Sequence, residues 1–547
     1  MPRIFTFEIL AYLSLAFVSL VLRIWASSRH LLNQEEALRA LAAWEFLQGQ
    51  PPEPAWPLSP ALMGLQTLVF FLFGPGDVAA RLPAILAGAL IPLAFFLFRH
   101  ILGKERALVA AAFSAFSPLW IFSSSQADGE AIGVLAILVA VGAFLRFQET
   151  GNSLWLYGGA CALGLGITSG LSVWTLAGEG IILAVLLRGK IKISELRVSH
   201  GFWIAFGASF FLSSTLFLFY PPGFGLVADS LALWLMSIFR GQLSFQPLLN
   251  LVLYEPLLIL GALWGLERLY LLAPVIFGLL IAILGGFEGP AGFLPILLPL
   301  TVMAAYGLYD FIRILVRETF SPQGPVALVL TLCLGVWGFL GVTGYTVGGD
   351  TRYLLISVVA LIGIVSILTF LGLMRGPEAS VWVVLVFVLV ASFLWEIKLA
   401  RGLNFSPYVE EHLPRCQFTS SEVKEVKGSL RKLSSYRAGD PTALEVIVVG
   451  ETPELRWYLK EFSALKVVEK GQILPVAEAI IALTEESISV GENFRGRRFA
   501  VRENCQIKTL KGFRLLRWLL YREPVAPREK EEAILWVKSS SPDRKHK

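Results

Sequence analysis

Charged residues are scarce in this sequence. Asp, Glu, Lys and Arg make up only 16% of the 547 residues, whereas 55% are hydrophobic and the mean hydropathy is +0.67. A soluble surface of this size needs more charge, so the composition excludes a soluble globular protein and indicates an integral membrane protein. Most of the charge that is present lies in short loops and after position 396. The sequence therefore predicts a transmembrane domain over residues 1–396, with a long outer loop at 28–80, and a soluble extracytoplasmic α/β domain over 397–547.

Cysteine is scarce too, and the four cysteines show no spacing typical of a metal site. Cys161 and Cys333 fall in apolar segments, where we expect them to occupy core-like positions. Cys416 and Cys505 share the C-terminal domain, and a disulfide between them is an open alternative.

Three further absences narrow the function. No small-residue cleavage site follows the first apolar segment, which therefore predicts an uncleaved helix rather than a signal peptide. Charged residues are rare within the apolar segments, Glu179 being the main exception, and this disfavours a transporter. The net charge of +5 comes mainly from Lys and Arg in short loops, where they orient helices, so we expect no nucleic-acid partner.

Apolar segments recur along the first 396 residues. About thirteen of them approach the ~20 residues that cross a bilayer, and they predict a polytopic, mainly α-helical membrane protein. They are residues 6–25, 81–98, 106–122, 129–146, 154–171, 173–188, 201–219, 248–266, 269–285, 291–312, 325–343, 353–374 and 379–396. A shorter apolar stretch, Leu58 to Gly74, is expected to lie along the outer interface.

Lys and Arg in short loops mark the cytoplasmic side of a membrane protein. If the helices alternate, the basic loops share one side; they contain Arg99, Lys104 and Arg106, then Arg188, Lys190, Lys192 and Arg197, then Arg313 and Arg317, and finally Arg375. We therefore expect a multi-pass protein of the cytoplasmic membrane, with the first outer loop and the chain after Trp395 outside.

The C-terminal domain shows alternating helical and extended patterns. Val423, Val426, Leu430 and Leu433 recur at helical spacing and predict an amphipathic helix. The segments "ALEVIVVG", "LKVVEK" and "AEAIIAL" are typical of strands, and "PELRWYLKEF" is typical of a helix. This alternation predicts a small α/β domain with a partly parallel sheet.

Two acidic clusters stand at the predicted outer face. Glu35 and Glu36 follow the first apolar segment, and Asp128 and Glu130 begin the fourth. Carboxylates there have an ordinary explanation, because acidic residues stabilise the first turn of a helix and Asn33 can cap it. Since both clusters fall on one side of the membrane, convergence on one site is the alternative.

The residues around these clusters resemble a known family. The stretches are "EEALRALAAWEFLQGQ", "LFGPGDVAARLPAILAGALIPLAFFLFRHILG", "ALVAAAFSAFSPLWIFSSSQADGEA", "LYEPLLILGALWGL" and "PELRWYLKEF". They are similar to C-type (GT-C fold) polytopic glycosyltransferases of family 39, in particular the bacterial relatives of protein O-mannosyltransferases and the lipid A aminoarabinose transferase, in a branch with a C-terminal outer domain. The similarity covers most of the chain and implies the GT-C fold.

The resemblance also implies residue roles. In the family an Asp-Glu pair in the first outer loop supplies the catalytic base, and Glu35 and Glu36 stand at that place here. Glu35 is thus the expected base, Asp128 orients it or shares its role, and Glu36 and Glu130 support them. An Arg common just before the second acid is replaced here by Gln126.

Sugar transfer from a polyprenyl phosphate needs a base for the acceptor's proton and cations for the departing phosphate. Arg81 and Arg352 are the candidate donor-phosphate ligands, although Asp77 and Asp350 stand close enough in sequence to pair with them. Glu255 is a secondary site candidate near the same face. Clustered carboxylates are compatible with a divalent metal, and no ligand spacing decides for or against one.

The sequence therefore predicts a hexosyltransferase-type membrane glycosyltransferase. Its donor would be a polyprenyl-phosphate sugar and its acceptor a protein, a lipid or a glycan. The altered residues at positions 35 and 126 support a second hypothesis, a catalytically degenerate GT-C protein that serves as a scaffold or partner subunit in the cell envelope.

Overall fold

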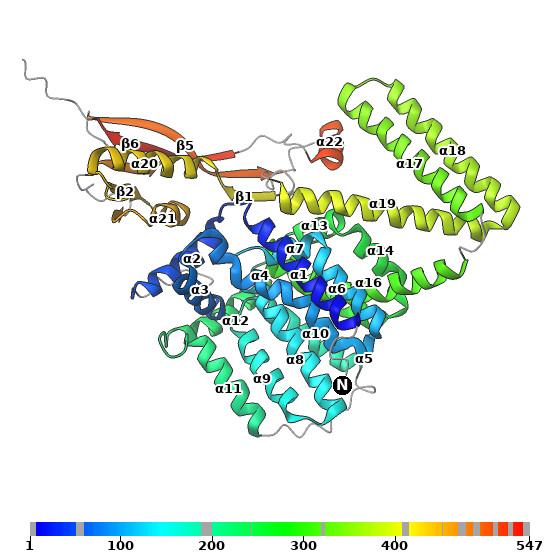
Figure 1. The fold of residues 1–547 in the computed structure, drawn as a ribbon, viewed down its shortest axis with the longest axis horizontal. Coiled ribbons are helices and arrows are strands. Elements are labelled where there is room, and N and C mark those ends of the chain that lie inside the picture. The colour runs from blue at the N-terminus through cyan, green and yellow to red at the C-terminus, as the bar shows by residue number, and fades with distance from the viewer. Residues whose placement is uncertain are drawn as a thin grey trace, which may run out of the picture.

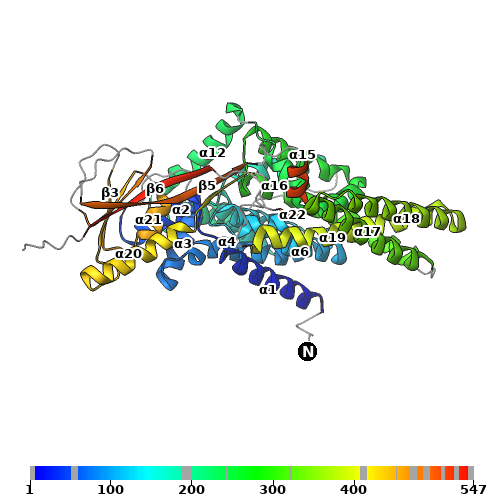
Figure 2. The same ribbon diagram turned by 90° about the horizontal axis from the view of Figure 1, so that it is seen from above.

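The computed structural model describes residues 7–50, 59–187, 200–241, 243–318, 323–406, 415–450, 452–468, 477–484, 493–506, 512–522 and 529–539. A body of packed helices carries a small sheet domain at one end, and a hairpin of two long helices stands apart from that body (Figures 1 and 2).

The helical part runs to Phe405. Its α-helices are α1 (Phe7–Ser27), α2 (Gln34–Leu47), α3 (Pro60–Phe73), α4 (Asp77–Ala94), α5 (Arg99–Leu102), α6 (Lys104–Phe116), α7 (Pro118–Ser124), α8 (Glu130–Thr150), α9 (Ser153–Ile167), α10 (Ser172–Leu186), α11 (His200–Ser214), α12 (Gly223–Arg240), α13 (Gln246–Tyr254), α14 (Pro256–Trp264), α15 (Leu269–Leu284), α16 (Pro290–Glu318), α17 (Gln323–Gly348), α18 (Arg352–Arg375) and α19 (Pro377–Phe405). The hairpin that stands apart is α17–α18.

The chain is a multi-pass membrane protein. Among the described residues, 8 helices are long and apolar enough to cross a membrane, or up to 10 if each of two bent pairs is one span. The bent pairs are α6–α7, at 61°, and α13–α14, at 89°. Each break precedes a proline at the start of the second helix, Pro118 or Pro256, where no backbone N–H can continue the first helix.

The polytopic architecture is confirmed, but the count of thirteen is not. Helices α9, α10 and α15 are apolar yet shorter than a span, whereas α12 is long enough and the sequence analysis did not count it. Cys161 and Cys333 are exposed rather than core-like, because an apolar neighbourhood in a membrane helix does not distinguish the lipid side from the interior.

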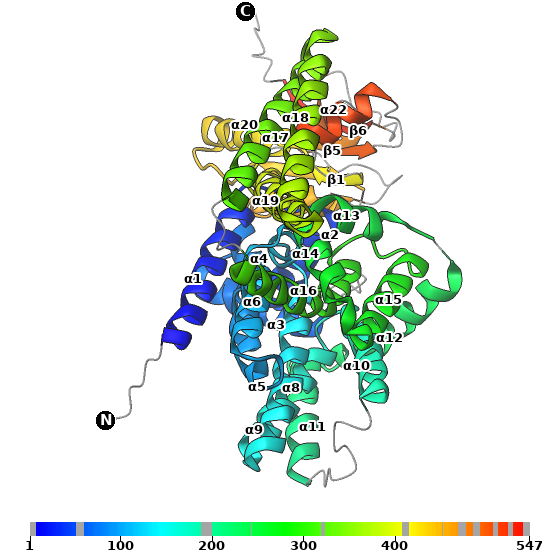
Figure 3. The same ribbon diagram turned by 90° about the vertical axis from the view of Figure 1, so that its right-hand side faces the viewer.

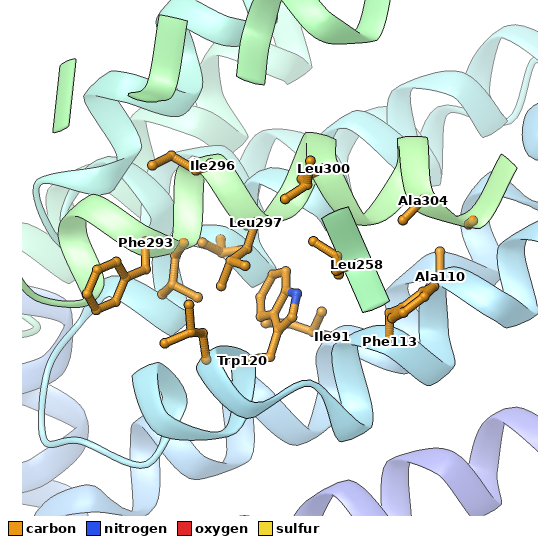
Figure 4. Close-up of a cluster of buried hydrophobic side chains, with 14 of the residues drawn as sticks. Ile91, Ala110, Phe113, Trp120, Leu258, Phe293, Ile296, Leu297, Leu300 and Ala304 are labelled. Atoms are coloured by element: carbon orange, nitrogen blue, oxygen red, sulfur yellow. The ribbon is translucent and has the colours of Figure 1, made fainter. Parts of the chain in front are cut away.

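The main apolar core supports the loop between α7 and α8. Trp120, Leu258 and Leu297 reach toward one another from α7, α14 and α16 and are completely buried (Figure 4). The Trp120 indole Nε1 donates to Thr301 Oγ1 at 3.0 Å, so its polar atom is satisfied within the core. Because α7 leads directly into the acidic loop at 125–129, this packing holds that loop in place.

The first of the predicted cytoplasmic loops lies next to the start of α1. Arg99 and Lys104 pair with Glu8 of α1 at 3.4 and 3.9 Å. The predicted basic loop at 188–197 lies outside the described residues. The sheet domain lies at the opposite end of α1 (Figure 1), and its location outside the membrane stays a prediction.

Within the described residues, the C-terminal domain has a six-stranded sheet in the order β1-β5-β6-β4-β2-β3. Its elements are β1 (Arg415–Thr419), α20 (Glu422–Ala438), β2 (Glu445–Val449), α21 (Pro453–Leu459), β3 (Ala464–Val468), β4 (Ala479–Leu483), β5 (Phe494–Gln506), α22 (Phe513–Tyr521) and β6 (Glu529–Lys538). Strand β2 is parallel to β3 and β4, and the other pairs are antiparallel. The predicted partly parallel α/β domain is therefore confirmed.

Strands β1, β5 and β6 were not predicted. Charged residues interrupt the apolar pattern of β5, which pairs with β1 and with β6. The register of β1 and β5 places Cys416 opposite Cys505. Their side chains lie outside the described part of the structure, so the disulfide stays a prediction.

Helix α21 docks the sheet domain on the helical body. Trp457 Nε1 donates to Asp77 Oδ1 at 2.9 Å, and the Tyr458 hydroxyl donates to Asp77 Oδ2 at 3.2 Å. The same hydroxyl accepts from the Leu32 N–H at 2.8 Å. An ion pair joins α21 to α2 as well. The segment "PELRWYLKEF" therefore fixes the start of α4 and the entry to α2, the helix that carries the first acidic cluster.

Candidate active site

The first acidic pair begins helix α2. Asn33 Oδ1 accepts from the Glu36 N–H at 2.9 Å, and Glu36 Oε2 accepts from the Asn33 N–H at 3.0 Å, which is a capping box. Successive helix residues diverge by about 100°, so the two glutamates point in different directions. Glu36 is 2% exposed, whereas the Glu35 side chain is 73% exposed. The capping explanation thus applies to Glu36 and leaves Glu35 outside it.

Glu36 forms a buried ion pair with Arg81 of α4. Arg81 Nε and Nη2 donate to Glu36 Oε1 and Oε2 at 2.8 and 2.6 Å, and the Ala127 N–H donates to Oε1 at 2.6 Å. One carboxylate thereby links α2, α4 and the second acidic loop. Burial alone would raise the pKa of the Glu36 carboxyl, but Arg81 and the hydrogen bonds outweigh it and hold the pKa below its usual value.

Arg81 has no donor left for a phosphate in this arrangement. Its three remaining N–H groups donate to the carbonyl oxygens of Ser27, His30 and Leu31 at 2.7, 2.8 and 2.9 Å, so all five guanidinium hydrogens are used. Asp77, the expected alternative partner, binds α21 instead. In this structure Arg81 therefore supports the wall behind the acidic clusters, and its role in phosphate binding stays a prediction.

The second acidic cluster lies between α7 and α8. Glu130 Oε1 and Oε2 accept from the N–H groups of Leu171 and Ser172 at 3.0 and 2.8 Å, so Glu130 caps the start of α10. Asp128 Oδ1 accepts from the Glu130 N–H at 3.1 Å. Glu130 thus anchors the loop, while Asp128 keeps its second carboxyl oxygen for the cavity described below.

Two backbone features hold this loop in position. A Cβ at Gly129 would lie 1.7 Å from the Ser169 carbonyl oxygen, so glycine is required where the loop meets the α9–α10 turn. On the other side, Ala127 donates to Glu36 and its carbonyl accepts from Arg39 Nη1 at 3.4 Å. The two acidic segments are therefore docked directly on each other.

Glu35, Asp128 and Glu130 line one cavity of 430 Å³. Its walls are the starts of α2, α3 and α8, the α9–α10 turn, part of α12 and the loop between α15 and α16. Figure 3 shows α10, α12 and α15 together on the side of the body away from α1. Three of the four predicted catalytic carboxylates thus face one cavity, and the fourth, Glu36, holds the wall behind them.

The charged residues of the cavity wall are mainly acidic. Arg39 is the only Lys or Arg among the described lining residues, and its Nη2 lies 3.1 Å from Glu35 Oε2. Glu288 lines the wall from the loop after α15. Burial, and next the charge of Glu130, raise the pKa of Asp128 well above its usual value. The site therefore combines an exposed, Arg-paired glutamate with an aspartic acid whose neutral form is favoured.

Arg352 and Glu255 do not line this cavity. Arg352 begins α18 in the separate hairpin (Figure 1), where its N–H donates to Asp350 Oδ1 at 2.9 Å. Glu255 is completely buried at the α13–α14 break, and its Oε1 accepts from Ser117 Oγ at 2.6 Å and from the Leu119 N–H at 2.8 Å. Glu255 therefore stabilises the start of α7, the helix that leads to the acidic loop.

Sequence reasoning missed several residues of the site. Arg39 has a signal, since it follows Glu35 by four helix residues and can pair with it. Gly129 had a signal as well, because a glycine between two acids suggests a close approach of another backbone. Nothing in one sequence indicates that Glu288 lines the same cavity as the two acidic clusters. In the described ranges, no group of three or more His, Cys, Asp or Glu side chains is arranged to hold a metal ion.

Comparisons with known proteins agree with the fold. Residues 55–218 match the family model of dolichyl-phosphate-mannose-protein mannosyltransferases. The crystal structure of ArnT from Cupriavidus metallidurans bound to undecaprenyl phosphate is similar with a TM-score of 0.52 and 14% sequence identity, over 97% of this chain and 98% of ArnT. An oligosaccharyltransferase from Archaeoglobus fulgidus has a TM-score of 0.39 and 13% identity, over 87% of this chain and 68% of that one. No curated protein matches the sequence.

These findings show the fold of the protein. The likeness to ArnT over nearly the whole of both chains shows the GT-C fold of membrane glycosyltransferases. The match to the mannosyltransferase family begins in the first outer loop and covers the second acidic cluster. The resemblance inferred from the sequence, to GT-C proteins of the mannosyltransferase and ArnT type, is thus confirmed.

Proposed function

We propose that this protein is a membrane glycosyltransferase that moves a sugar from a polyprenyl-phosphate donor to an acceptor at the outer face of the cytoplasmic membrane. The observation that carries the proposal is the cavity in which Glu35 and Asp128, from two separate loops, face one space beside Arg39. The fold supports it, and the similar ArnT structure contains undecaprenyl phosphate. The acceptor would be a protein, a lipid or a glycan.

Glu35 is the proposed base. It is exposed to the cavity and to solvent, and its carboxylate Oε2 lies 3.1 Å from Arg39 Nη2. A base in this position takes the proton of the acceptor hydroxyl as the sugar is transferred. Asp128, whose raised pKa favours the neutral carboxyl, would donate a hydrogen bond to the donor or acceptor in the same cavity.

Arg39 is the proposed contact for the donor phosphate. The family's usual Arg is replaced by Gln126, which lines the same cavity. Arg39 lies next to the second acidic loop, and its guanidinium offers more N–H groups than its contacts with Glu35 and Ala127 use. A cation in the cavity can therefore stabilise the departing phosphate although the second acidic loop lacks one.

The proposal is tested by transfer assays on the purified chain with a panel of polyprenyl-phosphate sugars. Glu35→Gln keeps the side-chain size but removes the base, and we expect turnover to fall by about 10²- to 10⁴-fold. Glu105→Gln is the matched control, because Glu105 is also an exposed glutamate in the first turn of a helix, α6. Equal turnover for wild type and Glu35→Gln would refute the catalytic role of Glu35.

A scaffold role is the second candidate function. The observation that favours it is the excess of carboxylates over the single basic residue, Arg39, among the described lining residues of the cavity, since a phosphate donor is itself an anion. A wild-type chain that transfers no sugar from any donor in the panel, yet co-purifies with another envelope protein independently of Glu35, would support this function.

A further inference from the structure

A second pocket lies where the sheet domain meets the membrane helices, away from the acidic cavity. Helix α22 rests against the ends of α17 and α19: the Tyr521 hydroxyl donates to the Thr343 carbonyl at 2.9 Å, and the Lys398 ammonium donates to the Leu520 carbonyl. A pocket of 350 Å³ remains between α19 and α22. It shares no lining residue with the acidic cavity.

Arg522 is the unusual residue of this pocket. It follows α22 with a positive φ of 58° and is only 4% exposed. Its guanidinium carbon lies 4.1 Å from the Trp518 ring centroid and 5.1 Å from that of Tyr254. Its Nε and Nη1 are buried and have no hydrogen-bond partner among the described residues. Buried donors without partners are costly, so this site favours a ligand that accepts hydrogen bonds.

The ligand should also be an anion. Lys398 and Arg401 line the pocket beside Arg522, and no described carboxylate forms a salt bridge with any of the three. A phosphate oxygen accepts from a guanidinium and attracts the neighbouring ammonium, and Arg is especially suited to this group. The pocket therefore has the donors and the charge for one phosphate.

The surroundings indicate that this phosphate belongs to a lipid. Lys398 lies 4.5 Å from the Trp395 ring, and Trp395 and Tyr521 both line the pocket. Trp and Tyr concentrate at the level of lipid headgroups, and basic pockets among membrane helices bind anionic headgroups. The apolar helix α19 lines the pocket, and the apolar helix α17 contacts α22 through Thr343. We propose that the pocket between α19 and α22 binds the phosphate of an anionic lipid, with Arg522 as its main ligand.

The test is native mass spectrometry of the full chain titrated with phosphatidylglycerol, a polyprenyl phosphate, diacylglycerol and inorganic phosphate. We expect both lipid phosphates to bind more tightly than diacylglycerol, which lacks the phosphate, and than inorganic phosphate, which lacks the chains. A preference between the two lipids would identify the occupant as the donor's carrier or as a bilayer lipid. Equal binding of diacylglycerol, or of inorganic phosphate, would overturn the proposal.

Variants assign the binding to Arg522. Arg522→Gln should weaken binding of the lipid phosphate roughly tenfold or more, because a charge-assisted hydrogen bond is lost. Lys398→Gln should weaken it less, and it carries the test if Arg522→Gln does not fold. Arg514→Gln, an exposed position on the same helix, is the control and should bind like wild type. Unchanged affinity in both Arg522→Gln and Lys398→Gln would refute the site, and this readout is independent of sugar transfer.

Discussion

Replacing Glu36 by Gln should destabilise the protein far more than the same change at its neighbour Glu35. The Glu36 carboxylate accepts four hydrogen bonds, two from Arg81 and one each from the N–H groups of Ala127 and Asn33. The amide oxygen of Gln can keep the two hydrogen bonds that Oε1 accepts, from Arg81 and Ala127. The NH₂ group, in the place of Oε2, would face an Arg81 N–H and the Asn33 N–H, which are donors too. Two hydrogen bonds are lost and the buried guanidinium loses its counter-charge.

The magnitude follows from burial. Both side chains of the Glu36–Arg81 pair are 3% exposed, and breaking a buried pair by removing one partner costs about 3–5 kcal/mol. The Glu35–Arg39 pair has a glutamate that is 73% exposed, and an exposed pair contributes only about 0–1 kcal/mol. The two variants remove the same charge from adjacent residues, so their difference measures the burial and the hydrogen bonds of Glu36.

The assay is thermal unfolding of the purified chain in detergent, read as an apparent midpoint at one heating rate. The double variant Glu36→Gln with Arg81→Gln should lower the midpoint by less than the sum of the two single variants. The reason is that either single variant already breaks the ion pair between the two residues. The folded-state pKa of Glu36 is lowered, so its contribution is complete above the ordinary range near pH ~4.3 and declines as the pH falls through the folded value. An equal midpoint for Glu36→Gln and Glu35→Gln would refute this reasoning.

Three further predictions concern the site, the domain contact and the orientation. Asp128→Asn should raise the unfolding midpoint at neutral pH and lower sugar transfer. Because the pKa of Asp128 is raised, the stability that Asp128 contributes is present below the usual pKa range of Asp and is lost as the pH rises, and Asn does not ionise. A lower midpoint would contradict this. Tyr458→Phe should cost about 1–3 kcal/mol through the bonds with Leu32 and Asp77, measured by limited proteolysis between the domains. In intact cells, an impermeant thiol reagent should label Tyr436→Cys but not Lys104→Cys, both exposed, and the reverse would invert the orientation.

The helical body and the parallel strands were predictable because their signals are local. Apolar length identifies membrane helices, and the α20 periodicity identifies its buried face. The count of spans was not confirmed, because the local signals at some positions were ambiguous. Pro118 and Pro256 break two helices, and α12 carries enough polar residues to be passed over as a loop.

The site was predictable only in part, because its contacts join distant residues. The sequence gathers the acids into two clusters, but one sequence cannot tell that Arg81 pairs with Glu36, 45 residues away, rather than with Asp77. The pairing also depends on α21, whose Trp457 engages Asp77 from the far end of the chain. Contacts between distant parts of the chain, and not closeness in sequence, therefore decide the partner of Arg81.

Each acidic cluster divides its two carboxylates in the same way. The carboxylates of Glu36 and Glu130 accept hydrogen bonds from backbone N–H groups, and Glu36 also pairs with Arg81. These two residues therefore build the cavity wall. Glu35 and Asp128 keep carboxyl oxygens toward the cavity. Loss of transfer at Glu36 or Glu130 is therefore expected from a displaced wall, whatever the chemistry. Only loss at Glu35 or Asp128 in a protein of normal stability assigns a carboxylate to the reaction, and this separates the enzyme from the scaffold.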